Sequence, residues 1–405
     1  MRDEGARVLA TLVRVAGSLE LAEDATQDAI ERALLTWPRD GVPDNPRAWL
    51  IVTARRRAVD LIRREAARPG KEALAMLPFD QTPDDDLLSL IFTCCHPALS
   101  LDAQVALALR TLGGLTTPEV AKALLVPEAT MAKRLTRARQ KIQNARIPYR
   151  VPPAADLPSR LTGVAATVYL IFNEGYDDLR RADLTGEAIR LARMLAGLMP
   201  DEPTALGLLA LLLLQDSRRA ARLDPAGRPV LLADQDRARW DPDAIREGVT
   251  VLGAALRRSP DRPDRYAVQA AIAACHALAP SYAATAWDAV ISWYDVLLTV
   301  QDTPVVRLNR AAAVAERDGP GAGLALVEGI SGLEVYPYWH ATRAELLARL
   351  SRPAEARAAY SAALALELSP PRRAHLEARL AAVSGPFQRH VSGDHHRGWH
   401  GTSAG

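Results

Sequence analysis

The feature that most constrains this chain is a basic helical segment, 128–142, that follows a shorter helical segment opened by Pro118. Val126-Pro127 separates the two, because proline has no backbone donor and disfavours a helical conformation in the residue before it. In steps of about 100° per residue, the basic segment has one apolar stripe, formed by Met131, Leu135, Ala138 and Ile142. Its opposite side carries a hydroxyl and cations, which suit base edges and phosphates. The pattern predicts a helix-turn-helix that contacts DNA through Thr130, Lys133, Arg134, Arg137 and Lys141.

A solvated basic helix with no partner is the alternative interpretation of this segment. Seven basic residues and no acidic one lie between Lys133 and Arg150, which favours DNA contact. The net charge of the whole chain is only +2, so the basic signal is local.

Length and composition predict an all-α protein of two or three domains. The chain has 405 residues and is dominated by alanine and leucine, which favour helices. From about 160 to 384 the patterns are helical and are separated by Pro and Gly, apart from 227–234, whose composition permits a short extended piece. Segment 65–86 has the composition of a linker, and the polar residues 385–405 predict a disordered tail.

The three cysteines indicate neither disulfides nor a metal site. Adjacent Cys94 and Cys95 cannot easily chelate one ion, and no CxxC pair is present, so we expect buried packing and no metal or cofactor. The sequence shows no signal peptide, and its longest apolar run, 205–214, is too short to span a bilayer. We therefore expect a cytoplasmic protein without a membrane partner.

Two further helix faces carry signals near the N-terminus. In 47–64 an indole and arginines share one side, as on surfaces that stack on exposed bases; the alternative is that Trp49 packs under the loop 44–46. In 20–35 one side is acidic, which favours a basic protein partner over DNA, although solvated acidic faces are common.

The C-terminal half contains a weak internal repeat. Residues 315–326 align with 348–359 at an offset of 33, and Pro320 matches Pro353, each opening a second helix. This period is typical of tetratricopeptide-like helix pairs, with 339–370 and 183–215 as the clearest copies. The carboxylates around Glu174 have no nucleophile, metal set or phosphate loop nearby, and the charged cluster around Trp240 is interpreted as structural. No catalysis is indicated, so we expect a non-enzyme.

Together, LAEDATQDAI, NPRAWLIVTARRRAVDLIRRE and LTTPEVAKALLVPEATMAKRLTRARQKI resemble the extracytoplasmic-function group of bacterial sigma factors over about residues 5–146. The resemblance implies binding to the β′ coiled coil of core RNA polymerase through Glu23, Asp24, Gln27 and Asp28. It implies −35 recognition by the helix-turn-helix, and −10 recognition and melting by Asn45, Trp49, Arg55, Arg56, Asp60 and Arg63. The family often has asparagine at the position of Arg56, which leaves the base preference there open.

LIFTCCHPALS, VYLIFNEGY and LLADQDRARWD are similar to the subgroup that carries a long tetratricopeptide-like extension, thought to adjust sigma activity. The expected organisation is sigma region 2 in 1–64, a linker in 65–86, region 4 in 87–146, the extension in 155–384 and the tail. Promoter DNA, core polymerase and a regulatory protein or ligand at the repeats are the expected partners. The alternatives are a stand-alone helix-turn-helix regulator with a tetratricopeptide sensor, and a peptide-binding scaffold.

Overall fold

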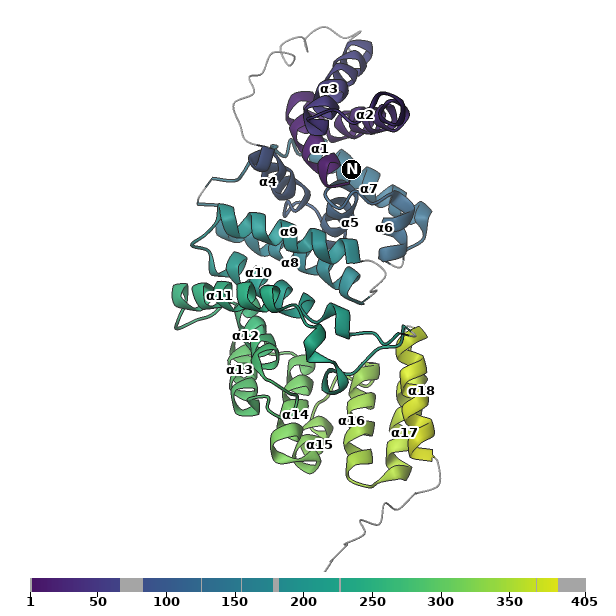
Figure 1. The fold of residues 1–405 in the computed structure, drawn as a ribbon, viewed down its shortest axis with the longest axis vertical. Coiled ribbons are helices and arrows are strands. Elements are labelled where there is room, and N and C mark those ends of the chain that lie inside the picture. Colours follow the sequence, from purple (N-terminus) through teal and green to yellow (C-terminus); the bar gives the residue numbers. More distant parts are fainter. Residues whose placement is uncertain are drawn as a thin grey trace, which may run out of the picture. The chain divides into compact units, whose positions relative to one another are not determined.

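A computed structural model describes residues 2–65, 83–124, 126–153, 155–177, 182–225, 227–368 and 370–384. These residues form α-helices α1 to α18 and the short 3-10 helices η3 to η5, with no strand among them (Figure 1). The all-α prediction is therefore confirmed. Segment 227–234 forms no strand, but it is extended at one point, where the Val230 amide donates to the Arg222 carbonyl at 2.8 Å, before it ends in η4 (Leu232–Asp234). Residues 66–82 of the expected linker and the tail 385–405 lie outside the described part of the chain.

The chain divides into two compact units. The first comprises Met1–Leu223 and Val230–Gln301, and the second comprises Asp224–Pro229 and Asp302–Gly405. Each unit has its own hydrophobic core.

The first three helices pack together through small side chains. They are α1 (Arg2–Ala16), α2 (Leu19–Asp40) and α3 (Pro46–Glu65). Every buried apolar residue of α2 after Leu19 is an alanine, which allows the neighbouring helices to approach closely. The apolar residues Leu50, Ala54 and Ala58 of α3 lie in this core.

The helix-turn-helix lies in the next group, α4 (Pro83–Cys94), α5 (Leu101–Thr111), α6 (Thr117–Ala123) and α7 (Glu128–Asn144). Helix α4 begins inside the segment whose composition predicts a linker. Its opening sequence, Pro83 followed by three aspartates, also suits the first turn of a helix. Proline loses no hydrogen bond there, and acidic side chains interact favourably with the positive end of the helix dipole.

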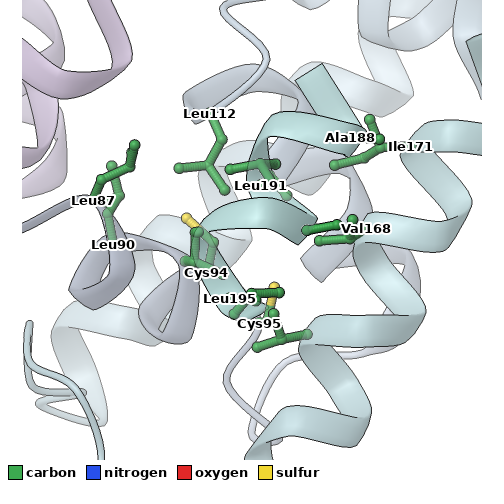
Figure 2. Packing of buried hydrophobic residues seen from close by; sticks show 14 of the residues in the cluster. Leu87, Leu90, Cys94, Cys95, Leu112, Val168, Ile171, Ala188, Leu191 and Leu195 are labelled. Carbon is green, nitrogen blue, oxygen red and sulfur yellow. The ribbon is translucent and has the colours of Figure 1, made fainter. Parts of the chain in front are cut away.

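Helices α8 (Leu157–Asp177) and α9 (Ala182–Leu198) share a core with α4 and α5. Figure 2 shows side chains of α4 and Leu112 beside Val168 and Ile171 of α8 and Leu191 and Leu195 of α9. Arg160 also donates a hydrogen bond of 2.5 Å to the carbonyl of Phe92. The extension thus begins as part of the same hydrophobic core as the helix-turn-helix group.

The longest apolar run forms α10 (Pro203–Asp216), which is buried on all sides from Ala205 to Leu214. It packs against α11 (Pro242–Arg258) and α12 (Arg265–Leu278), and α13 (Trp287–Val300) packs on α12. A Cβ at Gly207 would lie 2.6 Å from the backbone nitrogen of Ala267, so glycine is required where α10 meets α12. No helix in the described ranges is both long and apolar enough to cross a membrane.

The segment around Trp240 joins elements of the first unit. The short helix η5 (Arg237–Arg239) directly precedes Trp240, and η3 (Arg219–Ala221) lies earlier, after α10. Arg237 donates to the carbonyls of His276 (2.5 Å) and Ala279 (2.9 Å) at the end of α12, and its guanidinium lies 4.4 Å from the Trp240 ring centre. Asp241 accepts from two backbone amides at the start of α11. These contacts give the charged cluster structural roles.

The second unit contains α14 (Pro304–Asp318), α15 (Pro320–Glu328), α16 (Pro337–Arg349), α17 (Pro353–Leu364) and α18 (Pro370–Ser384). Pro320 and Pro353 each open the second helix of a pair, as the repeat predicts. Tyr360 is buried between Ala356 and Ala363 of its own helix, and its hydroxyl donates to Glu345 at 2.8 Å. The helix pairs confirm the tetratricopeptide-like organisation.

Candidate nucleic-acid interface

The helix-turn-helix is defined by local capping and by one apolar stripe. Thr116 and Glu119 form a reciprocal capping box at the start of α6, with Pro118 in its first turn. The Val126 amide donates to the Ala121 carbonyl at 2.9 Å, which closes the turn before α7. The four predicted stripe residues of α7 are its buried residues. On the opposite side of α7, Thr130, Lys133 and Arg137 are exposed.

The five residues predicted to contact the −35 element line one surface depression. This depression of about 420 Å³ lies between α7 and the start of α5, with Leu99, Ser100 and Ala103 on its other side. Arg134 lies 3.6 Å from Asp102, whose side chain is 74% exposed, so this ion pair is weak and can be exchanged for a ligand. The predicted residues Thr130, Lys133, Arg134, Arg137 and Lys141 thus form one cationic concavity.

Trp49 is half-buried at the start of α3 and packs on Trp37 of α2. The ring centres are 5.5 Å apart in an edge-to-face arrangement. The alternative drawn from the sequence placed Trp49 under the loop 44–46, whereas the aromatic partner comes from α2. Asn45 has a clear structural task, because its Oδ1 accepts from the Ala48 amide at 3.0 Å and caps α3.

The remaining residues predicted for the −10 element follow along α3. Arg56 and Asp60 are exposed and Arg55 is half-buried. The side chain of Arg63 lies outside the described part of the structure. Arg57, which the prediction omitted, is ion-paired with Asp28 of α2.

The four residues predicted to bind polymerase do not share one environment. Asp24 and Gln27 are exposed on α2, whereas Asp28 pairs with Arg57. Glu23 pairs with Arg139 of α7 at 2.7 Å, and its side chain is only 13% exposed. Burial raises the pKa of Glu23, although the nearby Arg139 and Arg110 oppose this rise. Sequence reasoning missed Arg139, whose only signal was its place in the basic run.

Two of the three cysteines, Cys94 and Cys95, lie in the core shared by α4, α5, α8 and α9, whereas Cys275 is half-buried on α12. Cys94 and Cys95 are fully buried, and burial raises the pKa of Cys95 to about 12. Among the described residues no group of three or more His, Cys, Asp or Glu side chains is arranged to hold a metal ion.

Comparison with known families matches three parts of the chain. Residues 1–68 match sigma-70 region 2, residues 89–142 match sigma-70 region 4, and residues 160–256 match a family of unknown function, DUF6596. An uncharacterised protein of Rhizobium meliloti, R00370, is 43% identical over 393 residues, which cover 92% of each chain.

Two further similarities are weaker. The probable ECF RNA polymerase sigma factor SigI of Mycobacterium tuberculosis is 29% identical over 153 residues, or 35% of this chain and 52% of SigI. The crystal structure of a tetratricopeptide repeat protein from Parabacteroides merdae aligns with 89% of this chain and 100% of its own, at 12% identity and a TM-score of 0.39. That TM-score is too low to support an argument.

Region 2 followed by region 4, with a helix-turn-helix in the latter, defines a sigma factor, a non-enzymatic component of transcription initiation. The chain belongs to the extracytoplasmic-function group of the sigma-70 family and carries a tetratricopeptide-like helical extension at its C-terminal end.

Proposed function

We propose that this chain binds core RNA polymerase, recognises promoter −10 and −35 elements and promotes DNA melting. Core polymerase would dock on the side of α2 that carries Glu23, Asp24, Gln27 and Asp28. The helical extension adjusts this activity, through its own contacts or through a regulatory protein or ligand bound at the repeats. We expect this action in the cytoplasm, where promoters and polymerase are found.

The observation that carries the proposal is the depression on α7. Helix α7 contributes four cations and the Thr130 hydroxyl to its lining, and apolar contacts bury the other side of the same helix. Cations hold phosphates, and arginine donates two hydrogen bonds to guanine in the major groove. This combination supports sequence-dependent contact with duplex DNA at the −35 element.

The start of α3 supports melting at the −10 element. A half-buried indole stacked edge-on against a second indole is held rigidly, and exposed Arg56 lies further along the helix. Rigid aromatics stack on unpaired bases, and arginines neutralise their backbone. A repressor that binds only duplex DNA has no use for such a surface, which favours a sigma factor over the stand-alone regulator.

The test is run-off transcription with purified core polymerase and a promoter selected from a random library. We expect the chain to bind core polymerase and to direct initiation from the selected sequence. Tight duplex binding without polymerase, together with no initiation in its presence, would instead establish the stand-alone regulator.

Arg134→Ala tests the −35 assignment. If Arg134 reads a base, the substitution costs about 1–3 kcal/mol of promoter affinity, confined to particular −35 sequences. Stability should change little, because the pair with exposed Asp102 is weak. Arg150→Ala, exposed and outside the depression, is the control. An equal loss on every −35 sequence would assign Arg134 to a phosphate.

A further inference from the structure

Helix α7 has a third face, which is directed at α2. Arg139 and Gln143 are four residues apart and so share one side of the helix. The Arg139 Nη2 lies 2.7 Å from the Glu23 Oε2, and the Gln143 Nε2 lies 3.4 Å from the Oγ of Ser18, the residue that precedes α2. We call these two contacts the α2–α7 latch.

The latch removes Glu23 from solvent. The Glu23 and Arg139 side chains are only 13% and 21% exposed. On the same side of α2, Gln27 and Glu31 line a depression of about 360 Å³ together with Arg110 and Gly114, at and beyond the end of α5. Part of the predicted polymerase-binding face therefore faces the helix-turn-helix group.

A second contact joins the helices α1–α3 to the helix-turn-helix group α4–α7. Asp86 of α4 is almost fully buried and accepts a hydrogen bond of 3.0 Å from Thr11 of α1. Arg14, one turn further along α1, lies 3.0 Å from the other oxygen of the same carboxylate. Burying a charged carboxylate is costly unless it is paired, so this contact favours one specific arrangement of α1 and α4.

We infer that the α2–α7 latch closes the polymerase-binding face of the free sigma factor, and that core polymerase must open it to bind. The inference rests on the proposed function, because it assigns Glu23 to polymerase. Glu23 is paired with Arg139 in the closed form, and at 13% exposure its carboxylate is out of reach of a second protein. The observed affinity for core polymerase then equals the affinity of the open form multiplied by the fraction of molecules that are open.

A reversible covalent lock tests this competition. Ser18→Cys and Gln143→Cys are combined in a Cys275→Ser background, which leaves only the buried Cys94 and Cys95 as native thiols. Oxidation should link the pair as a disulfide. We expect the oxidised protein to bind core polymerase at least about tenfold more weakly than the reduced protein, with full recovery on reduction. The two single-cysteine variants, treated identically, are the controls.

Arg139→Glu tests the same latch without a cross-link. It places two carboxylates together in the closed form and leaves α2 unchanged, so the open fraction rises. We expect core polymerase to bind about five- to tenfold more tightly. Arg150→Glu makes the same charge change at an exposed site and should have no effect.

Different outcomes would overturn the latch and the proposed function. A cysteine pair that does not link, a linked protein that binds core polymerase as tightly as the reduced one, or Arg139→Glu affinity equal to wild type would overturn the latch. No binding of core polymerase by the wild-type chain would instead overturn the proposed function, whether or not the cysteines link.

Discussion

At the scale of single residues, Trp49 combines a packing role with a proposed role in strand opening. Trp49→Ala removes the edge-to-face contact with Trp37 and should destabilise the helices α1–α3 by about 2 kcal/mol, since the indole is only half-buried. It should also reduce promoter melting, followed by permanganate reactivity of unpaired thymines, while core binding persists.

The control for Trp49 is Val52→Ala, a substitution of an exposed apolar residue on the same helix. It should leave melting unchanged. Normal permanganate reactivity in a folded Trp49→Ala protein would remove the −10 assignment.

His276 makes the stability of the first unit depend on pH. Burial, together with the cations of Arg218 and Arg237, lowers the pKa of His276 from 6.5 to about 4. Above pH 6.5 the imidazole is neutral in both states, whereas below it only the unfolded chain takes up the proton. Stability should therefore fall by about 3 kcal/mol as the pH falls from 6.5 to about 4.

Urea unfolding at pH values on either side of 6.5 measures this loss. In His276→Gln the unfolding free energy should differ less between the two pH values, because glutamine cannot take up the proton. His340→Gln changes a histidine of the second unit, so the stability of the first unit should depend on pH as in the wild type. An unchanged pH dependence in His276→Gln would contradict the assignment.

At the scale of elements, local patterns were predictable and pairings between distant elements were not. The buried stripe and the cationic side of α7 follow from helical periodicity alone, and both were predicted residue by residue. The pair of Glu23 with Arg139 depends on how α2 and α7 pack, which no local pattern encodes. The start of α4 was not predictable for another reason: a proline followed by acidic residues is typical both of linkers and of helix N-termini.

The shared core of α4, α5, α8 and α9 predicts how truncations behave. A chain ending at residue 154 loses α8 and α9 and exposes apolar side chains such as Cys95 and Leu112. Each costs about 1.5–3 kcal/mol, so a few of them equal the stability of a typical domain. We expect this fragment to aggregate or to unfold on dilution, as measured by circular dichroism and light scattering.

A chain ending at residue 301 keeps α8 to α13 and is the matched control. It should remain folded. Inactivity of the shorter fragment would then report lost folding of the helix-turn-helix group and not lost activation by the extension. A monomeric, fully helical 1–154 fragment would show that the shared core is dispensable.

At the scale of the whole molecule, two separate cores predict two unfolding transitions. The first core extends from Val8 to Ala274 and the second from Leu308 to Leu376. Domains with independent cores unfold independently unless a large apolar interface couples them. Calorimetry of the full chain should therefore resolve two transitions, and the 1–301 chain should retain only the one that belongs to the first unit, at an unchanged midpoint.

The same 1–301 chain separates regulation from folding. All the residues assigned to DNA and polymerase lie in the first unit, so it should bind core polymerase as the full chain does, and any change in transcription would be the effect of α14–α18. Equal transcription by both chains would remove the second unit as a modulator. A single transition in the full chain, or a lowered midpoint in 1–301, would mean that the two units unfold as one, so that α14–α18 act on the promoter-binding helices through stability.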